Sequence, residues 1–232
     1  MMNKQIVFGS DGWGGVMEDD FTEENVVRVA KAFTEYLTSN NSNQKQVAVG
    51  FDGRKDSKAF AGLVSKVLAE NQVKVIVSSA VVPTPILSFA TKQNECTAGI
   101  MVTGGHQAPQ FNGLKFKGAS GGPFNATETK QVESLSAAAT SGRLGRAPSD
   151  LISVVDFLPA YLCNLKTIVD FSVLRSFAEN PKNVAGVLID SMGGAGQNIL
   201  EDILIGCQWR AQTIFGEPEP NFFDRFPEAI SK

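Results

Sequence analysis

Short apolar runs alternate with amphipathic stretches along the N-terminal half of the chain, and this alternation restricts the possible folds more than any other feature. One helix face is marked by apolar residues three or four positions apart, namely Val26, Ala30, Phe33 and Leu37. Thr22 precedes them as a candidate N-cap. The run QVAVGF at 46–51 is bounded by polar residues, as a buried strand is. This pattern predicts a layered α/β domain.

Further elements continue the same rhythm. Strands are expected around 5–8, at 73–79 and at 97–103, and a second helical stripe over 60–68 separates two of the strands. The segment VVPTPILSFATKQ places prolines where a loop turns into a helix. The order of elements predicts a complete three-layer α/β/α domain over residues 1–145.

A second unit is expected beyond a polar, glycine-bearing linker at 140–150. Apolar residues at helical spacing follow it, and then come the strand NVAGVLID at 183–190 and a glycine turn into another helix. These elements predict a second α/β unit over 151–232. It is shorter than the first, so we expect a truncated α/β/α domain.

Composition excludes several classes of protein. The chain has 232 residues, a net charge of −3 and 43% hydrophobic residues, which argues against nucleic acid or an anionic membrane as the main partner. No apolar run reaches the roughly eighteen residues needed to cross a bilayer, and MMNKQIVFGSDG is too polar for a signal peptide. The three cysteines lie far apart and form no C-x-x-C pair, so we expect reduced thiols and a cytoplasmic location.

Polar residues follow two of the predicted strands. Asp52 and Arg54 come after the strand at 46–51, and the loop 104–107 comes after the strand at 97–103. Ligands of open α/β sheets collect at the carboxyl ends of strands, so we expect these residues to face one crevice. Two structural alternatives stay open: a local ion pair between Asp52 and Arg54, and a purely structural His106. As the only histidine, His106 cannot belong to a histidine cluster that binds metal.

The glycine turn DSMGGAGQNI at 190–199 has part of a dinucleotide-binding fingerprint. Gly194 and Gly196 supply the first G-x-G, but Ile199 stands where the third glycine is needed for close packing of helix on strand. We therefore interpret this segment as a tight turn from strand to helix.

Several stretches together resemble the α-D-phosphohexomutases, the phosphoglucomutase/phosphomannomutase family. FGSDGWGG at 8–15 resembles the family's F-G-T-D-G-x-R-G, VGFDGR at 49–54 its Y-D-x-R, and VPTP at 82–85 its P-T-P. The stretch GIMVTGGHQAPQFNGLKFKG at 99–118 resembles G-I-M-[IV]-T-A-S-H-N-P-x-x-Y-N-G-x-K. LIDSMGGAG and FGEPEPNFFDRFPEAI resemble two later family segments in the right order.

The resemblance implies a mechanism. Family members carry a phosphoserine in the T-A-S-H-N-P loop and pass its phosphate to a bound sugar phosphate. The bisphosphate then reorients and returns its other phosphate to the serine. Magnesium is held by a D-G-D-x-D-R loop of the second domain, and two later domains bind the sugar.

Carried over by position, the sequence departs from the family at the reactive groups. Gly105 occupies the place of the serine, and Gly14 replaces the arginine of G-x-R-G. His106 and Lys115 match the family's histidine and lysine and are the vestigial catalytic candidates. The residues expected to bind substrate are Asp52, Arg54, Gly104 and Gln107. The sequence contains no D-G-D-x-D-R loop, so no metal or other cofactor is expected for this chain.

Three functional hypotheses follow. The leading one is a truncated, non-catalytic phosphohexomutase homologue that binds a phosphosugar, phosphate or a mutase partner weakly. The alternative is an active phosphoglucomutase or phosphomannomutase module that works with other domains or chains. The third is a decayed gene product without a selected role. We further expect a homodimer, or association with another mutase chain, through residues 183–232.

Overall fold

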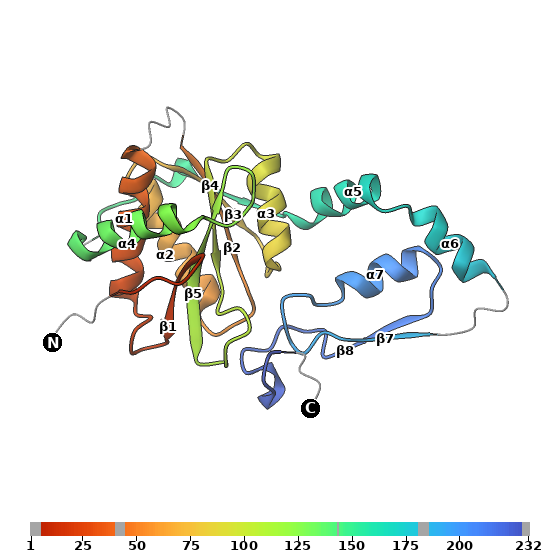
Figure 1. The fold of residues 1–232 in the computed structure, drawn as a ribbon. Coiled ribbons are helices and arrows are strands. Elements are labelled where there is room, and N and C mark those ends of the chain that lie inside the picture. Colours follow the sequence, from red (N-terminus) through yellow and green to blue (C-terminus); the bar gives the residue numbers. More distant parts are fainter. Residues whose placement is uncertain (1–5, 40–44, 143, 181–185, 229–232) are drawn as a thin grey trace.

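The computed structural model describes residues 6–39, 45–142, 144–180 and 186–228. A six-stranded mixed sheet forms the centre of the N-terminal unit (Figure 1). Its strands, in spatial order, are β1 (Gly12–Val16), β5 (Phe111–Gly118), β4 (Ala98–Val102), β2 (Gln46–Phe51), β3 (Lys74–Ser78) and β6 (Ile152–Val155). The four strands from β4 to β6 run parallel, whereas β5 is antiparallel to both β4 and β1.

Helices cover both faces of this sheet, which confirms the predicted three-layer α/β/α domain (Figure 1). One face carries α1 (Glu23–Ser39), α2 (Ser57–Glu70) and α4 (Ala126–Ala138). The other face carries α3 (Thr84–Gln93), against which the C-terminal unit packs its first helix. The two faces bury separate apolar clusters.

Helix α1 forms where the sequence predicts it. Thr22 is its N-cap, since the Asn25 N–H donates to the Thr22 hydroxyl over 3.3 Å. The four residues of the predicted apolar stripe are all buried. Phe33 stacks on Phe116 of β5 with 4.9 Å between ring centroids. The apolar face of α1 is therefore held by the sheet, and a large share of the helix's stability comes from this burial.

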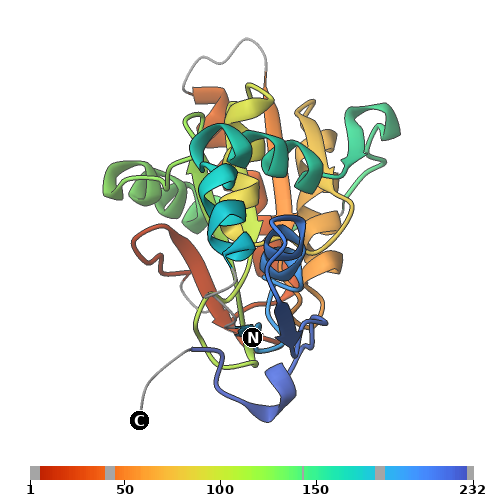
Figure 2. The ribbon, with the colours of Figure 1, turned by 90° about the vertical axis from the view of Figure 1, so that its right-hand side faces the viewer.

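The C-terminal unit extends away from the sheet in Figure 1, and in the view of Figure 2 it lies in front of the N-terminal unit. It consists of α5 (Leu158–Ile168), α6 (Phe171–Glu179), β7 (Val187–Asp190), α7 (Ile199–Gly206) and β8 (Ala211–Ile214). Strands β7 and β8 pair in parallel as a two-stranded sheet. Phe157 and Tyr161 pack at the α3 face, with the Tyr161 ring 5.7 Å from that of Phe89, so the two units are in direct contact.

The first strand differs from the prediction. Residues 6–8 form no strand, Gln5 lies outside the described residues, and the strand runs over Gly12–Val16 instead. This segment, GWGGV, has low intrinsic strand propensity and is ordered by pairing with β5. Glycine is required at Gly12, where φ is 155° and a Cβ atom would collide with the Leu114 carbonyl oxygen.

The sheet also takes a strand from beyond the expected linker. Strand β6 follows residues 140–150, yet it pairs with β3 as the sheet edge, with Val75 opposite Ile152. The residues expected to open the second unit thus complete the first sheet. The expected strand at 183–190 is found over Val187–Asp190, and residues 183–185 lie outside the described ranges. In the described part of the chain, no helix is long and apolar enough to span a membrane.

Candidate functional site

The loop between β4 and β5 lies at the carboxyl ends of β2 and β4, beside the segment that follows β2. The Asp52 N–H donates to the Val102 carbonyl oxygen over 3.0 Å, which brings the ends of these strands together. The predicted groups, Asp52 with Arg54 and the loop 104–107, are therefore neighbours in space. A cleft of 610 Å³ adjoins Asp52 and Arg54 and is lined in part by Lys58 and Pro218, but residues 104–107 do not line it.

The Arg54 guanidinium binds the backbone carbonyl groups of the loop. Its Nη1 donates to the carbonyl oxygens of Ala108 and Phe111 over 2.8 and 3.1 Å, and its Nη2 to those of Gly105 and Gln107 over 2.8 and 2.7 Å. Its Nε lies 3.2 Å from Asp52 Oδ2, so the ion pair considered from sequence is present. The terminal N–H groups of the guanidinium are thus taken up by loop carbonyl groups, and its Nε lies beside a carboxylate. Arg54 fixes the loop rather than offering a free donor to a ligand.

Burial lowers the pKa of the Arg54 guanidinium, and the neighbouring Asp52 carboxylate opposes this shift. Arginine stays protonated in proteins under all ordinary conditions, so the group keeps its charge. Asp52 is itself part of a polar chain: its Oδ1 accepts from the Ser57 hydroxyl over 2.7 Å, and Ser57 accepts from Asn112 Nδ2 over 2.8 Å. These hydrogen bonds between side chains connect the end of β2 and the start of β5 to α2.

Gly105 occupies the tip of the loop beside Lys115. Its φ is +60°, and a Cβ atom built on it would lie 3.8 Å from Lys115 Nζ. Lys115 in turn pairs with Asp11, whose Oδ2 is 3.1 Å from Nζ. A side chain at position 105 would therefore face an ammonium group across an ordinary van der Waals distance. Gly105 leaves this space open.

The remaining loop residues are turned to solvent. Gly105, His106 and Gln107 are exposed, whereas Gly104 is buried against the Arg54 guanidinium. The Gly105 N–H donates to the Thr103 hydroxyl over 3.0 Å. Within the described part of the chain, the N–H groups of His106 and Ala108 carry no hydrogen bond. The loop thus presents two unbonded backbone donors and the nearby charge of Lys115, which together suit an anion.

Gly14 lies in β1 opposite Gly113 of β5, and it is exposed. A Cβ atom there would lie 3.1 Å from the Asn112 carbonyl oxygen, so a larger residue would require a small shift of β5. The position contributes no charge to the site.

The described residues do not fit the Mg²⁺ that the resemblance implies. No three acidic, histidine or cysteine side chains gather among them. Magnesium prefers carboxylate oxygens and phosphates in octahedral geometry, and this part of the chain offers no such set.

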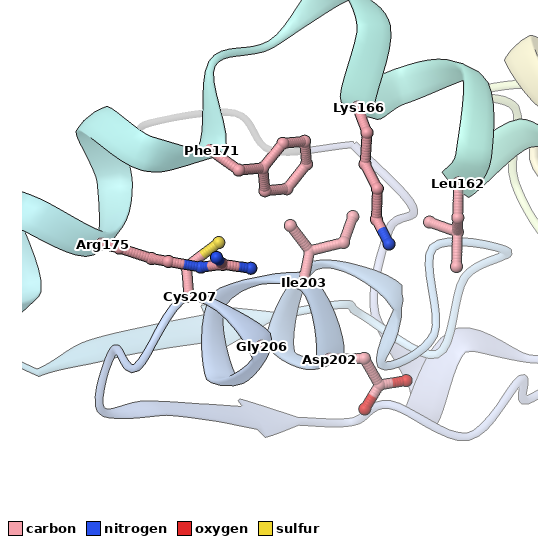
Figure 3. Close-up of a pocket in the computed structure, with 8 residues that line it drawn as sticks. All are labelled: Leu162, Lys166, Phe171, Arg175, Asp202, Ile203, Gly206 and Cys207. Atoms are coloured by element: carbon pink, nitrogen blue, oxygen red, sulfur yellow. The ribbon is translucent and has the colours of Figure 1, made fainter.

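A second cavity of 330 Å³ lies between α5, α6 and α7 (Figure 3). Its walls are mainly apolar, with Phe171 and Ile203 facing each other and Lys166 and Arg175 at its sides. It contains none of the residues predicted to bind or react with substrate.

Comparison with known proteins decides the family. A family model described as "Phosphoglucomutase/phosphomannomutase, alpha/beta/alpha domain I" matches residues 5–143. The chain belongs to the phosphoglucomutase/phosphomannomutase family. The resemblance found in the sequence motifs is thereby confirmed.

Individual phosphohexomutase relatives match most of the chain. A Methanosphaera stadtmanae protein named as a phosphoglucosamine mutase is 25% identical over 96% of this chain and 47% of that protein. A Haemophilus influenzae protein named as a phosphomannomutase is 28% identical over 77% of this chain and 36% of its own length. The solved structure of a Thermus thermophilus protein named as a phosphomannomutase superimposes with a TM-score of 0.87 and 35% identity, covering 97% of this chain and 49% of that one.

The chain spans about half the length, or less, of the phosphohexomutase relatives it matches. Sequence reasoning missed Asp11, Ser57 and Asn112, which position Lys115, Asp52 and the β5 backbone. Asp11 lies in the motif GSDG, and a carboxylate between small residues was the sequence signal that could have identified it.

Proposed function

We propose that this chain is a non-catalytic phosphohexomutase-family module that binds the phosphate group of a sugar phosphate weakly at the Gly105 loop. The observation that carries the proposal is the geometry at Gly105: the position faces Lys115 Nζ but bears no oxygen that could accept a phosphoryl group. Covalent transfer through this loop needs such an oxygen as both nucleophile and phosphate donor. Loss of a covalent nucleophile alone has cost a hydrolase about a million-fold in rate.

Binding rests on groups that remain. The Lys115 ammonium and the unbonded N–H groups of exposed His106 and half-buried Ala108 can attract a phosphate oxygen. Asp11 opposes this attraction because its carboxylate already pairs with Lys115. We therefore expect an affinity of roughly millimolar, or about 4 kcal/mol. The three free cysteines fit the reducing cytoplasm that we propose as its location.

Titration with phosphate and with glucose 6-phosphate, followed by amide shifts at residues 104–116, tests this binding. Lys115→Met should weaken the response at least several-fold, whereas Lys130→Met, an exposed lysine on α4, should leave it unchanged. Unchanged amide shifts in the unsubstituted protein at tens of millimolar ligand, roughly ten times the expected dissociation constant, would refute the retained site.

Intact-mass analysis tests the loss of catalysis. After incubation with glucose 1,6-bisphosphate, we expect no phosphorylated protein and no conversion of glucose 1-phosphate or mannose 1-phosphate. A stoichiometric gain of one phosphate would overturn the proposal.

An active module that is completed by other chains is the second candidate. It is supported by the exposed apolar residues of the C-terminal unit, among them Leu188, Leu200 and Ile205. Turnover that appears only when a chain carrying a D-G-D-x-D-R loop is added would favour this candidate.

A further inference from the structure

Phe222 of the C-terminal unit lies on the guanidinium that holds the Gly105 loop. The Arg54 Cζ atom is 4.9 Å from the centroid of the Phe222 ring, and Phe222 is buried with 7% of its surface exposed. The terminal N–H groups of Arg54 donate to loop carbonyls and its Nε lies beside Asp52, so the flat face of its planar group is what a neighbour can still contact. An aromatic ring on that face is attracted to the cation.

The backbone that carries Phe222 is strained. Phe222, Phe223 and Asp224 have φ values of 54°, 54° and 57°, so three consecutive residues other than glycine adopt the left-handed conformation. L-residues avoid this conformation because Cβ approaches the following carbonyl oxygen. Such outliers persist where the surroundings hold them, and they gather at functional positions.

Specific contacts hold this turn. The Glu219 Oε2 atom accepts from the N–H groups of Asn221 and Phe223, each over 2.9 Å. Immediately after the turn, Arg225 pairs with Asp190 of β7 over 2.9 Å, and its guanidinium lies 4.8 Å from the Phe215 ring centroid. The turn is thus fastened at both ends to the C-terminal unit while Phe222 reaches the N-terminal one.

Pro218, which belongs to the same segment as Phe222, also contacts the first unit beside Arg54. A Cβ atom on Gly53 would lie 2.7 Å from Pro218 Cβ, so only glycine at position 53 permits this approach. Gln197 Nε2 adds a hydrogen bond to the Val81 carbonyl oxygen over 3.0 Å. The segment 217–225 therefore meets the first unit directly beside Arg54.

We propose that Phe222 is a positioning residue through which the C-terminal unit fixes the Gly105 loop. Phe222 holds the Arg54 guanidinium in the plane where it binds four loop carbonyl oxygens, and those bonds set the loop's shape. This inference goes beyond phosphate binding, because it concerns the order of the loop whether or not a ligand binds.

Amide hydrogen exchange of the full chain tests the proposal. Phe222→Ala should accelerate exchange of the Gln107 and Phe111 N–H groups, which are bonded within the loop, by roughly tenfold. Phe223→Ala is the matched control, since Phe223 belongs to the same strained turn but contacts Phe215 instead of Arg54. Amides further into the sheet, such as those of Ile100 in β4 and Phe116 in β5, should keep their rates in both variants.

Conservative replacements separate positioning from simple packing. Phe222→Tyr keeps an aromatic face, so amide exchange of the loop should stay slow. Phe222→Leu fills the space without that face, so amide exchange of the loop should become faster. Gly53→Ala pushes Pro218 away while residue 222 stays phenylalanine, and it should also accelerate amide exchange of the loop.

Two results would overturn the proposal: loop exchange unchanged by Phe222→Ala and Gly53→Ala, or equal acceleration by Phe222→Ala and Phe223→Ala. If Phe222→Ala unfolds the C-terminal unit, the comparison of Phe222→Leu with Phe222→Tyr decides instead. Equal amide exchange rates of the loop in those two variants would refute the role of the ring. A failed phosphate titration would refute the proposed binding alone, since the exchange rates are measured without ligand.

Discussion

Gly105 combines two properties that a serine at the same place would not share. Its φ of +60° suits glycine, and its missing side chain leaves the space beside Lys115 Nζ empty. The loop therefore keeps its shape through backbone carbonyl groups bound to Arg54, and this shape does not depend on the side chain at its tip. Shape and reactivity are separable at this position.

The variant Gly105→Ser tests that separation. We expect the protein to fold with a free energy of unfolding lower by about 1 kcal/mol, because serine is strained at this φ. On the proposed non-catalytic role we expect no mutase turnover, since Gly14 carries no charge and the sequence has no D-G-D-x-D-R loop to neutralise a transferring phosphate. Gly105→Ala is the control for backbone strain without a hydroxyl. Turnover at an ordinary mutase rate would show that the serine alone had been missing.

Lys117 is a second informative residue, two positions along β5 from Lys115. Only 7% of its surface is exposed, and its ammonium group has no hydrogen bond or ion pair among the described residues. Burial lowers the Lys117 pKa, and repulsion from Lys115 adds to this shift while Asp11 opposes it. The folded state therefore gives up this proton at a lower pH than the unfolded state does.

Between the folded and unfolded pKa of Lys117, the unfolded state binds more protons, so stability rises with pH. Lys117→Met removes a charge on a largely buried side chain, and we expect it to raise the free energy of unfolding at pH 7 by up to about 1 kcal/mol. This gain should shrink as the pH approaches 10.5, the ordinary lysine value. Urea unfolding at pH 7 and pH 10 measures it, with exposed Lys130→Met as the comparison for loss of one charge. A gain that is the same at both pH values would contradict the burial argument.

At the scale of elements, α4 shows how local chemistry starts a helix that has little amphipathic pattern. Asn125 Oδ1 accepts from the N–H groups of Thr127 and Glu128 over 2.9 and 3.0 Å, and Glu128 Oε2 accepts from the Asn125 N–H over 2.8 Å. This is a complete capping box. Asn125→Ala should lower the free energy of unfolding by about 1 kcal/mol. Thr127→Ala in the same first turn should have less effect by thermal or urea unfolding, and equal losses would show that the cap contributes nothing.

The sequence predicted those elements whose side chains repeat with a clear period. Strand β2 was predicted at its observed bounds and α1 by its apolar stripe, because burial on one face or both leaves a pattern in the residues themselves. Strand β1 was misplaced because three of its five residues are glycine, and its order comes from pairing with β5. The sequence placed Arg54 beside the loop but not the direction of its guanidinium, which depends on carbonyl groups more than fifty positions away.

At the scale of the whole molecule, the two units are in direct contact. Strand β6 completes the first sheet from beyond the expected linker, and α5 packs on α3. Such pairing joins segments far apart in the sequence, so no local pattern in ISVV could have assigned it to one sheet or the other. The left-handed turn at Phe222 could not be predicted either, since nothing in the sequence NFFD indicates three positive φ values.

The C-terminal unit leaves much apolar surface uncovered. Strands β7 and β8 pair only with each other in the described ranges, so each has an open edge. Leu188 of β7 is 66% exposed, and Phe226 is 53% exposed. Burial of apolar surface contributes roughly 25 cal/mol per Å², part of which offsets the costs of association. We therefore propose that the chain associates with itself through residues 183–232, of which 186–228 are described.

Sedimentation or light scattering of the full chain measures this association. At about 100 μM, a dimer with a dissociation constant of about 10 μM would be the main species. Leu188→Lys places a charge on the apolar face of the β7 edge and should weaken dimerisation at least about tenfold, or 1.4 kcal/mol. Val173→Lys on α6 is the matched control, because Val173 is 61% exposed but lies outside the proposed surface. A chain that stays monomeric at this concentration, or two lysine variants that weaken the dimer equally, would place the contact elsewhere or exclude it.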